Sequence, residues 1–227
     1  MRLHEIVFLH GFGFDGRAWR AQLEAFPKSI APDVPGFGSR QMEGAADLGE
    51  LEEVARDAHV VGHSLGAAVA VDLALRLEGR LRSLTLVNPL LLGRAGNIAS
   101  WPTCVERAKA GDIDGARAAW LADALFARLD ASARADVTKI VGDYRCGHWA
   151  GKTSTGFRFP DPLAPLAALG VRVLVVSSTG DLESFQAMAR EYAKAVPGAK
   201  LEVLDAGHMT PMEAPEPFNA LLRAFVA

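Results

Sequence analysis

The sequence predicts an α/β protein of three layers, in which helices pack on both faces of a mostly parallel sheet. Strand-like apolar runs alternate with helical patterns along most of the 227 residues, and such alternation is typical of parallel sheets. Strand signals disappear between residues 94 and 165, where helical patterns dominate. We therefore expect a core formed by residues 1–93 and 166–227, with a helical cap inserted at 94–165.

The expected strands are short apolar runs bounded by turn-forming residues. They cover residues 3–9, 29–32, 58–62, 82–87, 171–177 and 201–204. The expected helices follow the helical apolar period and cover residues 17–26, 47–57, 65–78, 101–110, 112–128, 131–145 and 215–226. Parallel strands end at one edge of the sheet, and ligands bind outside that edge. The cap is expected to lie over it.

Residues 62–66 read Gly-His-Ser-Leu-Gly and join an expected strand to an expected helix. In this context the G-x-S-x-G pattern places the serine on a strained turn with an exposed hydroxyl. The two glycines lack the β-carbons that would clash where strand and helix approach, and the helix start directs free N–H groups toward the serine. Ser64 is therefore the candidate nucleophile. The alternative is an incidental serine in a turn.

A serine hydroxyl reacts only when a neighbouring base takes its proton and a third group orients that base. In this architecture the acid and then the histidine follow the serine along the chain. Asp181 and His208 each follow an expected strand, so both should lie at the edge that carries Ser64. Glu183 and Asp205 are rival carboxylates. We expect Glu183 to begin a helix and Asp205 to cap a strand end.

Composition excludes several classes of function. The net charge is −3 without a basic stripe, so nucleic acid is not an expected partner. We find no apolar run of membrane-spanning length and no signal-peptide layout, and we expect a cytoplasmic protein without a membrane partner. Cys104 and Cys146 are expected to be free thiols, with a disulfide as the alternative. The six histidines lack metal-ligand spacing, so neither metal nor cofactor is expected.

Three of the four tryptophans, Trp101, Trp120 and Trp149, lie in the expected cap. A lid rich in aromatic side chains would form the wall of an apolar pocket and exclude water from it. These three residues are therefore candidate substrate-binding residues. The alternative is that they form a small core of the cap itself.

Over essentially the whole chain, these residues resemble the α/β-hydrolase fold. Four segments carry the resemblance: His-Gly-Phe-Gly at 10–13, Asp-Val-Pro-Gly-Phe-Gly at 33–38, Gly-His-Ser-Leu-Gly at 62–66 and Gly-His-Met-Thr-Pro-Met-Glu-Ala-Pro at 207–215. The resemblance implies a catalytic triad of Ser64, Asp181 and His208. It also implies an oxyanion hole formed by the backbone N–H groups of Phe12 and Leu65.

Within this fold the chain is similar to small carboxylesterases, such as the pimeloyl-carrier-protein methyl ester esterases. That similarity implies hydrolysis of a small or medium-chain ester, either free or linked to a carrier protein. The chain is also similar to the menaquinone-pathway synthases, lyases that use the same triad to abstract a proton. Such a substrate carries several carboxylates and would require cations such as Arg145, Lys152 and Arg158, all in the expected cap.

Two further classes of function are open. Residues 11–16 match the G-x-G-x-x-G pattern and Asp33 ends the next strand, which is typical of a dinucleotide-binding oxidoreductase. That hypothesis leaves 62–66 and 207–215 unexplained and places phenylalanines beside the glycines. A non-catalytic binding protein that kept the fold is the other class. The intact serine, aspartate and histidine argue against it.

Overall fold

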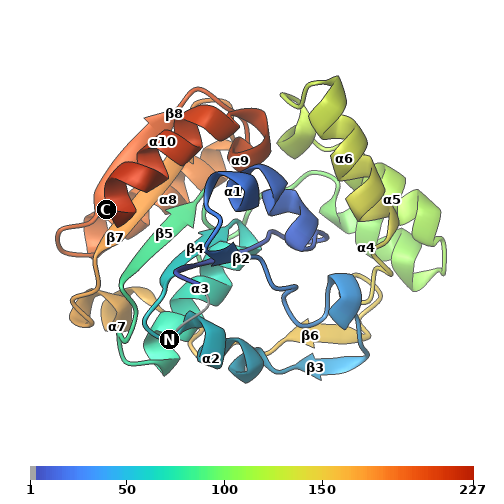
Figure 1. The fold of residues 1–227 in the computed structure, drawn as a ribbon. Helices are drawn as coiled ribbons and strands as arrows, with labels where there is room; N and C mark the ends of the chain where they lie inside the picture. The colour runs from blue at the N-terminus through green and yellow to red at the C-terminus, as the bar shows by residue number, and fades with distance from the viewer. Residues whose placement is uncertain (1–3) are drawn as a thin grey trace.

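A computed structural model describes residues 4–227 as a six-stranded sheet between two layers of helices (Figure 1). The strands lie in the order β2-β1-β4-β5-β7-β8, and every neighbouring pair is parallel. Their bounds are β1 Ile6–Leu9, β2 Ser29–Ile30, β4 His59–His63, β5 Ser83–Val87, β7 Val173–Ser178 and β8 Lys200–Leu204. The predicted fold class is confirmed. The first residue of the expected strand 3–9 lies outside the described residues.

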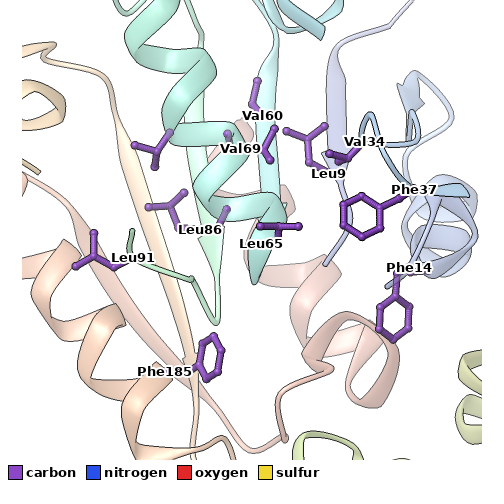
Figure 2. Close-up of a cluster of buried hydrophobic side chains, with 14 of the residues drawn as sticks. Leu9, Phe14, Val34, Phe37, Val60, Leu65, Val69, Leu86, Leu91 and Phe185 are labelled. Atoms are coloured by element: carbon purple, nitrogen blue, oxygen red, sulfur yellow. The ribbon is translucent and has the colours of Figure 1, made fainter. Parts of the chain in front are cut away.

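Alternate side chains of each strand enter two separate cores, because successive residues of a strand point to opposite faces. Ile6 and Phe8 of β1 pack in the core covered by α1 (Arg20–Ala25) and α10 (Pro215–Val226). The opposite core includes Val7 and Leu9 and is covered by α2 (Glu52–Ala55), α3 (Leu65–Arg76), α7 (Leu163–Ala168) and α8 (Glu183–Ala195). Figure 2 shows Val69 of α3 beside Val60 of β4 in this second core.

Several expected helices are shorter or are divided. Short 3₁₀ turns precede two of them: η1 (Gly16–Trp19) leads into α1, and η3 (Leu48–Leu51) leads into α2. The single helix expected at 112–128 is wrong, because α5 (Ile113–Leu121) ends and η4 (Ala124–Phe126) follows. The cause is Asp123, whose carboxylate accepts a hydrogen bond from the N–H of Leu125 (3.1 Å). An aspartate cap of this kind begins a new helical turn.

The expectation that residues 94–165 contain no strand is also wrong. Strand β6 (Thr153–Thr155) pairs in parallel with β3 (Gly44–Ala46) in a separate two-stranded sheet. Each strand has three residues and neither shows an apolar alternation, so no local signal announces the pairing. A third short element, η2 (Gly38–Arg40), precedes β3.

Residues 94–165, which we call the cap segment, contain the helices α4 (Trp101–Lys109), α5 and α6 (Ala131–Gly142). In Figure 1 these three helices form a group beside the sheet. Two ion pairs join α6 and the residues after it to the first helical region of the core. Arg17 contacts Asp143 (2.7 Å) and Arg20 contacts Asp136 (2.7 Å). The cap segment therefore has polar as well as apolar contacts with the core.

A buried ion pair on α3 holds the chain where it leaves the cap segment. The side chains of Asp72 and Arg76 are 1% and 2% exposed, and their closest atoms lie 2.5 Å apart. Asp72 also accepts hydrogen bonds from the N–H groups of Arg158 (2.8 Å) and Phe159 (3.2 Å). Arg76 donates to the carbonyl of Gly156 (2.7 Å). The pair thus connects α3, the helix that follows Ser64, to residues 156–159.

Removing one partner of this pair should be costly. The change Asp72→Ala leaves Arg76 buried without its closest carboxylate and should lower the free energy of unfolding by about 3–5 kcal/mol, measured by urea denaturation. As a control, Glu5→Ala removes an exposed pair with Lys28 and should cost less than about 1 kcal/mol. Equal losses in the two variants would contradict this prediction.

Candidate active site

Ser64 occupies a sharp turn between β4 and α3. Its φ is 53° and its ψ is −116°, a strained backbone conformation that is common at functional sites. The neighbouring glycines permit this turn. A β-carbon on Gly66 would lie 2.1 Å from the carbonyl oxygen of Leu9, and one on Gly62 would lie 2.2 Å from that of Gly66. No larger residue fits either position without moving the backbone.

Three side chains from distant parts of the chain meet at this turn. His208 Nε2 lies 3.0 Å from Ser64 Oγ, and His208 Nδ1 lies 2.9 Å and 3.0 Å from the two carboxylate oxygens of Asp181. All three residues are buried. Because the carboxylate only accepts hydrogen bonds, Nδ1 carries the proton and Nε2 is free to accept from the serine hydroxyl. The structure therefore places the predicted serine, aspartate and histidine together.

The two rival carboxylates lie elsewhere. Glu183 is the first residue of α8, as expected, and forms an ion pair with Arg190. Asp205 is exposed and forms an ion pair with Arg128 (2.8 Å). Neither is a hydrogen-bond partner of His208.

The loop after β1 brings a second backbone segment to Ser64. A β-carbon on Gly11 would lie 3.4 Å from that of Ser64. His10 fixes the loop: its Nδ1 donates to the carbonyl of Gly11 (2.9 Å), and its Nε2 accepts from the N–H of Val34 (2.9 Å). Burial lowers the pKa of His10, which keeps the ring neutral and able to accept that bond.

The N–H groups of Phe12 and Leu65 are available to a ligand. Leu65 is the first residue of α3, so its N–H has no partner within the helix. Within the described part of the chain, neither N–H donates to a turn, loop or side-chain acceptor. Free N–H groups at a helix start favour a negative charge next to them. Both N–H groups are therefore without a partner in the described chain, as the expected oxyanion hole requires.

Sequence reasoning missed the residues that hold the main chain of His208. The carbonyl of His208 accepts hydrogen bonds from His63 Nε2 (2.8 Å) and from Asn88 Nδ2 (2.8 Å). Asn88 also donates to the hydroxyl of Thr210 (2.9 Å). Their positions along the chain could have identified both residues. His63 ends β4 and Asn88 follows β5, so the two lie at the same edge of the sheet. Burial, with a smaller contribution from nearby His208, lowers the pKa of His63 to about 3.

A cavity of about 510 Å³ opens onto Ser64 between the core and the cap segment. Its wall includes Trp101 and Trp120, whereas Trp149 is buried and does not line it. Apart from His63, Ser64 and His208, the wall consists of glycine, apolar and neutral polar residues: Gly11, Phe12, Phe14, Leu65, Leu90, Ala95, Gly96, Asn97, Ile98, Pro102, Leu125, Phe126, Thr155, Phe185 and Met209. It contains no lysine, arginine or carboxylate of the described chain. Arg145, Lys152 and Arg158 therefore lie off the wall.

Comparison with known proteins identifies the fold family. The model of the alpha/beta hydrolase family matches residues 6–221, nearly the whole chain. The chain belongs to this family. The resemblance drawn from the four sequence segments is thus confirmed.

Two curated relatives are similar over different shares of the chain. The dihydrolipoyllysine-residue acetyltransferase component of the acetoin cleaving system from Cupriavidus necator is 33% identical over 96% of this chain and 62% of that protein. The pimeloyl-[acyl-carrier protein] methyl ester esterase from Aeromonas hydrophila is 33% identical over 47% of this chain and 45% of that protein. The chain therefore spans less than two thirds of the length of these relatives.

Solved structures show the same fold at low identity. A carboxylesterase from Nitrososphaera gargenis superposes with a TM-score of 0.83 at 19% identity, covering 99% of this chain and 90% of that one. MenH from S. aureus superposes with a TM-score of 0.80 at 19% identity, covering 100% and 94%. At this identity the likeness concerns the fold alone.

Three other features concern residues 4–227 only. No helix there is both long and apolar enough to cross a membrane. No group of three or more histidine, cysteine or acidic side chains in that range could hold a metal ion. Cys104 and Cys146 are both buried free thiols.

Acid should destabilise the fold through His63. Its pKa is about 3 in the folded protein and about 6.5 in an unfolded chain, so the unfolded state binds the extra proton between these values. The contribution of His63 to the free energy of unfolding is therefore fully present above about pH 6.5, and it falls by about 1.4 kcal/mol for each pH unit between there and about pH 3. Urea denaturation at several pH values would measure this slope.

The variant His63→Gln serves as the control, since glutamine offers an N–H donor but does not titrate. Its free energy of unfolding should fall less steeply with decreasing pH, and the difference in slope should be about the contribution of one histidine. An unchanged slope would contradict the assignment to His63.

Proposed function

We propose that this chain is a serine hydrolase that cleaves uncharged carboxylic esters through an acyl-enzyme. One observation carries the proposal: the hydroxyl of Ser64, the ring of His208 and the carboxylate of Asp181 form a continuous series of contacts below an apolar cavity. The same constellation performs acyl transfer on several unrelated folds. Membership of the alpha/beta hydrolase family supports the same chemistry.

The first half of the reaction acylates the serine. His208 Nε2 takes the hydroxyl proton as Ser64 Oγ attacks the ester carbonyl carbon. Asp181 accepts the hydrogen bond from Nδ1 and stabilises the imidazolium that forms. The carbonyl oxygen becomes an oxyanion beside the N–H groups of Phe12 and Leu65. One such donor, already in place, lowers the barrier by about 3–4 kcal/mol.

The second half releases the acid. As the tetrahedral intermediate collapses, His208 gives its proton to the leaving alcohol and the acyl group stays on Ser64 Oγ. Water then attacks the acyl carbon while His208 takes one of its protons. A second tetrahedral intermediate collapses, the proton returns to Ser64, and the carboxylic acid leaves.

The cavity wall indicates which esters fit. Its surface is largely apolar and offers no cation, so a carboxylate on the substrate would lose its hydration without gaining a partner. The wall therefore favours neutral alkyl or aryl esters of small or medium length. It argues against a lyase acting on a polycarboxylate, because Arg145, Lys152 and Arg158 do not line the cavity.

Acyl transfer to a thiol is a second candidate. It is suggested by the acetyltransferase component that matches 96% of this chain. The acyl-enzyme would form in the same way, and a thiol would replace water in the second half. Dihydrolipoamide added to the esterase assay separates the two, since faster alcohol release with an S-acyl product would favour transfer over hydrolysis.

Loss of the serine or the aspartate should abolish turnover with little effect on the fold. Asp181→Asn should lower kcat by about 10⁴, because His208 then adopts the wrong tautomer. Ser64→Ala should lower kcat by several orders of magnitude and abolish labelling by a fluorophosphonate probe. The measurements are p-nitrophenyl ester kinetics and mass spectrometry of the labelled protein. A loss of less than tenfold in Asp181→Asn would assign the role to another carboxylate.

Charge on the acyl group should decide which esters react. With p-nitrophenyl butyrate and mono-p-nitrophenyl succinate, two esters of similar size, kcat/KM should be at least about a hundredfold higher for the neutral one. Longer neutral esters, up to the laurate, would then define the length limit of the cavity. Equal rates for the neutral and the charged ester would show that the apolar wall does not select the substrate.

A further inference from the structure

The side chain of Phe12 lies at the centre of an aromatic cluster that joins the loop after β1 to the cap segment. Its ring is surrounded by six others, one from the core and five from the cap segment. The distances between ring centroids are 5.3 Å to Phe37 of the core, and 4.8 Å to Trp101, 5.9 Å to Trp120, 5.7 Å to Tyr144, 5.5 Å to His148 and 5.3 Å to Trp149. Phe12 is thus the main apolar contact between this loop and the cap segment.

The surrounding rings also pack against one another. The ring of Trp149 lies 5.5 Å from Trp120, 6.0 Å from Trp101 and 5.3 Å from Tyr144. Most of these pairs meet edge to face, the arrangement that aromatic rings prefer and that fixes their relative orientation. A change in one ring of the cluster therefore alters the site in which the ring of Phe12 sits.

The peptide unit that carries the Phe12 N–H is held through its carbonyl, that of Gly11, which accepts a hydrogen bond from His10 Nδ1 (2.9 Å). Glycines flank Phe12, and Gly13 has a φ of +77°. The turn is closed by one long backbone hydrogen bond, from the N–H of Phe14 to the carbonyl of Gly11 (3.3 Å). The N–H of Leu65, in contrast, belongs to the first turn of a buried helix. His10 and Phe14 thus hold the Phe12 N–H from one side, through the Gly11 carbonyl of the same peptide unit, and the ring cluster holds the side chain of Phe12 on the other.

We propose that Phe12 is a positioning residue through which the cap segment aims an oxyanion-binding N–H at the reacting carbonyl. This inference rests on the proposed ester hydrolysis and adds a role for residues outside the cavity. Tight packing around the Phe12 ring should raise kcat, because the Phe12 N–H donates to the charge that develops in the transition state. Packing that only shapes the cavity would instead change KM.

Trp149 separates these two effects. It contacts the Phe12 ring but does not line the cavity, so a change there removes no atom of the wall itself. Phe12 itself lines the cavity, and its substitution alters both the wall and the cluster. Tyr144 has the same two properties as Trp149: it is buried against Phe12, and it does not line the cavity.

The experiment compares Phe12→Leu, Trp149→Leu and the double variant with the wild type on p-nitrophenyl butyrate. Each single change should lower kcat by about tenfold or more, and Trp149→Leu should leave KM unchanged within about twofold. The double variant should be little worse than Phe12→Leu alone, because both changes remove the same contact. Trp149→Phe, which keeps a ring against Phe12, should recover most of kcat. Tyr144→Leu replaces Trp149→Leu if that variant does not fold.

A second readout reports on the oxyanion itself. Sulfur accepts hydrogen bonds more weakly than oxygen, so a well-aimed donor makes an ester react faster than its thionoester. The ratio of kcat/KM for ester over thionoester should fall by about threefold or more in Phe12→Leu and Trp149→Leu. Titration of active Ser64 with a fluorophosphonate corrects every rate for misfolded protein. A purely structural role would lower the active fraction and leave the ratio unchanged.

Three results would overturn the proposal: an unchanged ester-to-thionoester ratio, an unchanged kcat in Trp149→Leu, or independent effects that multiply in the double variant. Each of these, with an active wild type, leaves the proposed hydrolase function standing. A wild type that neither hydrolyses esters nor reacts with the fluorophosphonate overturns both proposals.

Discussion

The close approach of β4 and α3 is the constraint on which the site depends. Gly62 allows β4 to approach the start of α3, and Gly66 allows α3 to approach the end of β1, both at distances that leave no room for a β-carbon. The turn between β4 and α3 then holds Ser64 at a positive φ, with the first N–H of α3 beside its hydroxyl. Because the neighbouring strands are parallel, the loops that follow them lie around that one hydroxyl.

The sequence was sufficient to place the three polar side chains, since each follows a strand of a sheet whose edge collects such turns. Ser64 was marked by its glycines and His208 by its place after the last strand. Asp181 was distinguished from Glu183 because a carboxylate that begins a helix is already used at that position. These predictions require only the strand order and local sequence patterns, and both can be recognised in short segments of the chain.

Contacts between distant segments have no comparable pattern in the sequence. The pairing of β3 with β6 involves three polar or small residues on each side, and the cap tryptophans were indistinguishable until packing placed Trp149 away from the cavity. Asn88 carries no functional signal in the sequence, because one side-chain amide after a strand has many ordinary uses. Delivery of an ester on a carrier protein stays a prediction.

Two consecutive residues, His63 at the end of β4 and Ser64 in the turn after it, contact opposite ends of His208. Ser64 meets the imidazole, and His63 donates to the main-chain carbonyl. Because these two residues are neighbours in the chain, one short stretch of backbone positions both contacts. Docking of the segment around His208 therefore places its main chain against His63 and its imidazole against Ser64. A chain in which that segment has not docked would hold Ser64 without the base that the proposed hydrolysis requires.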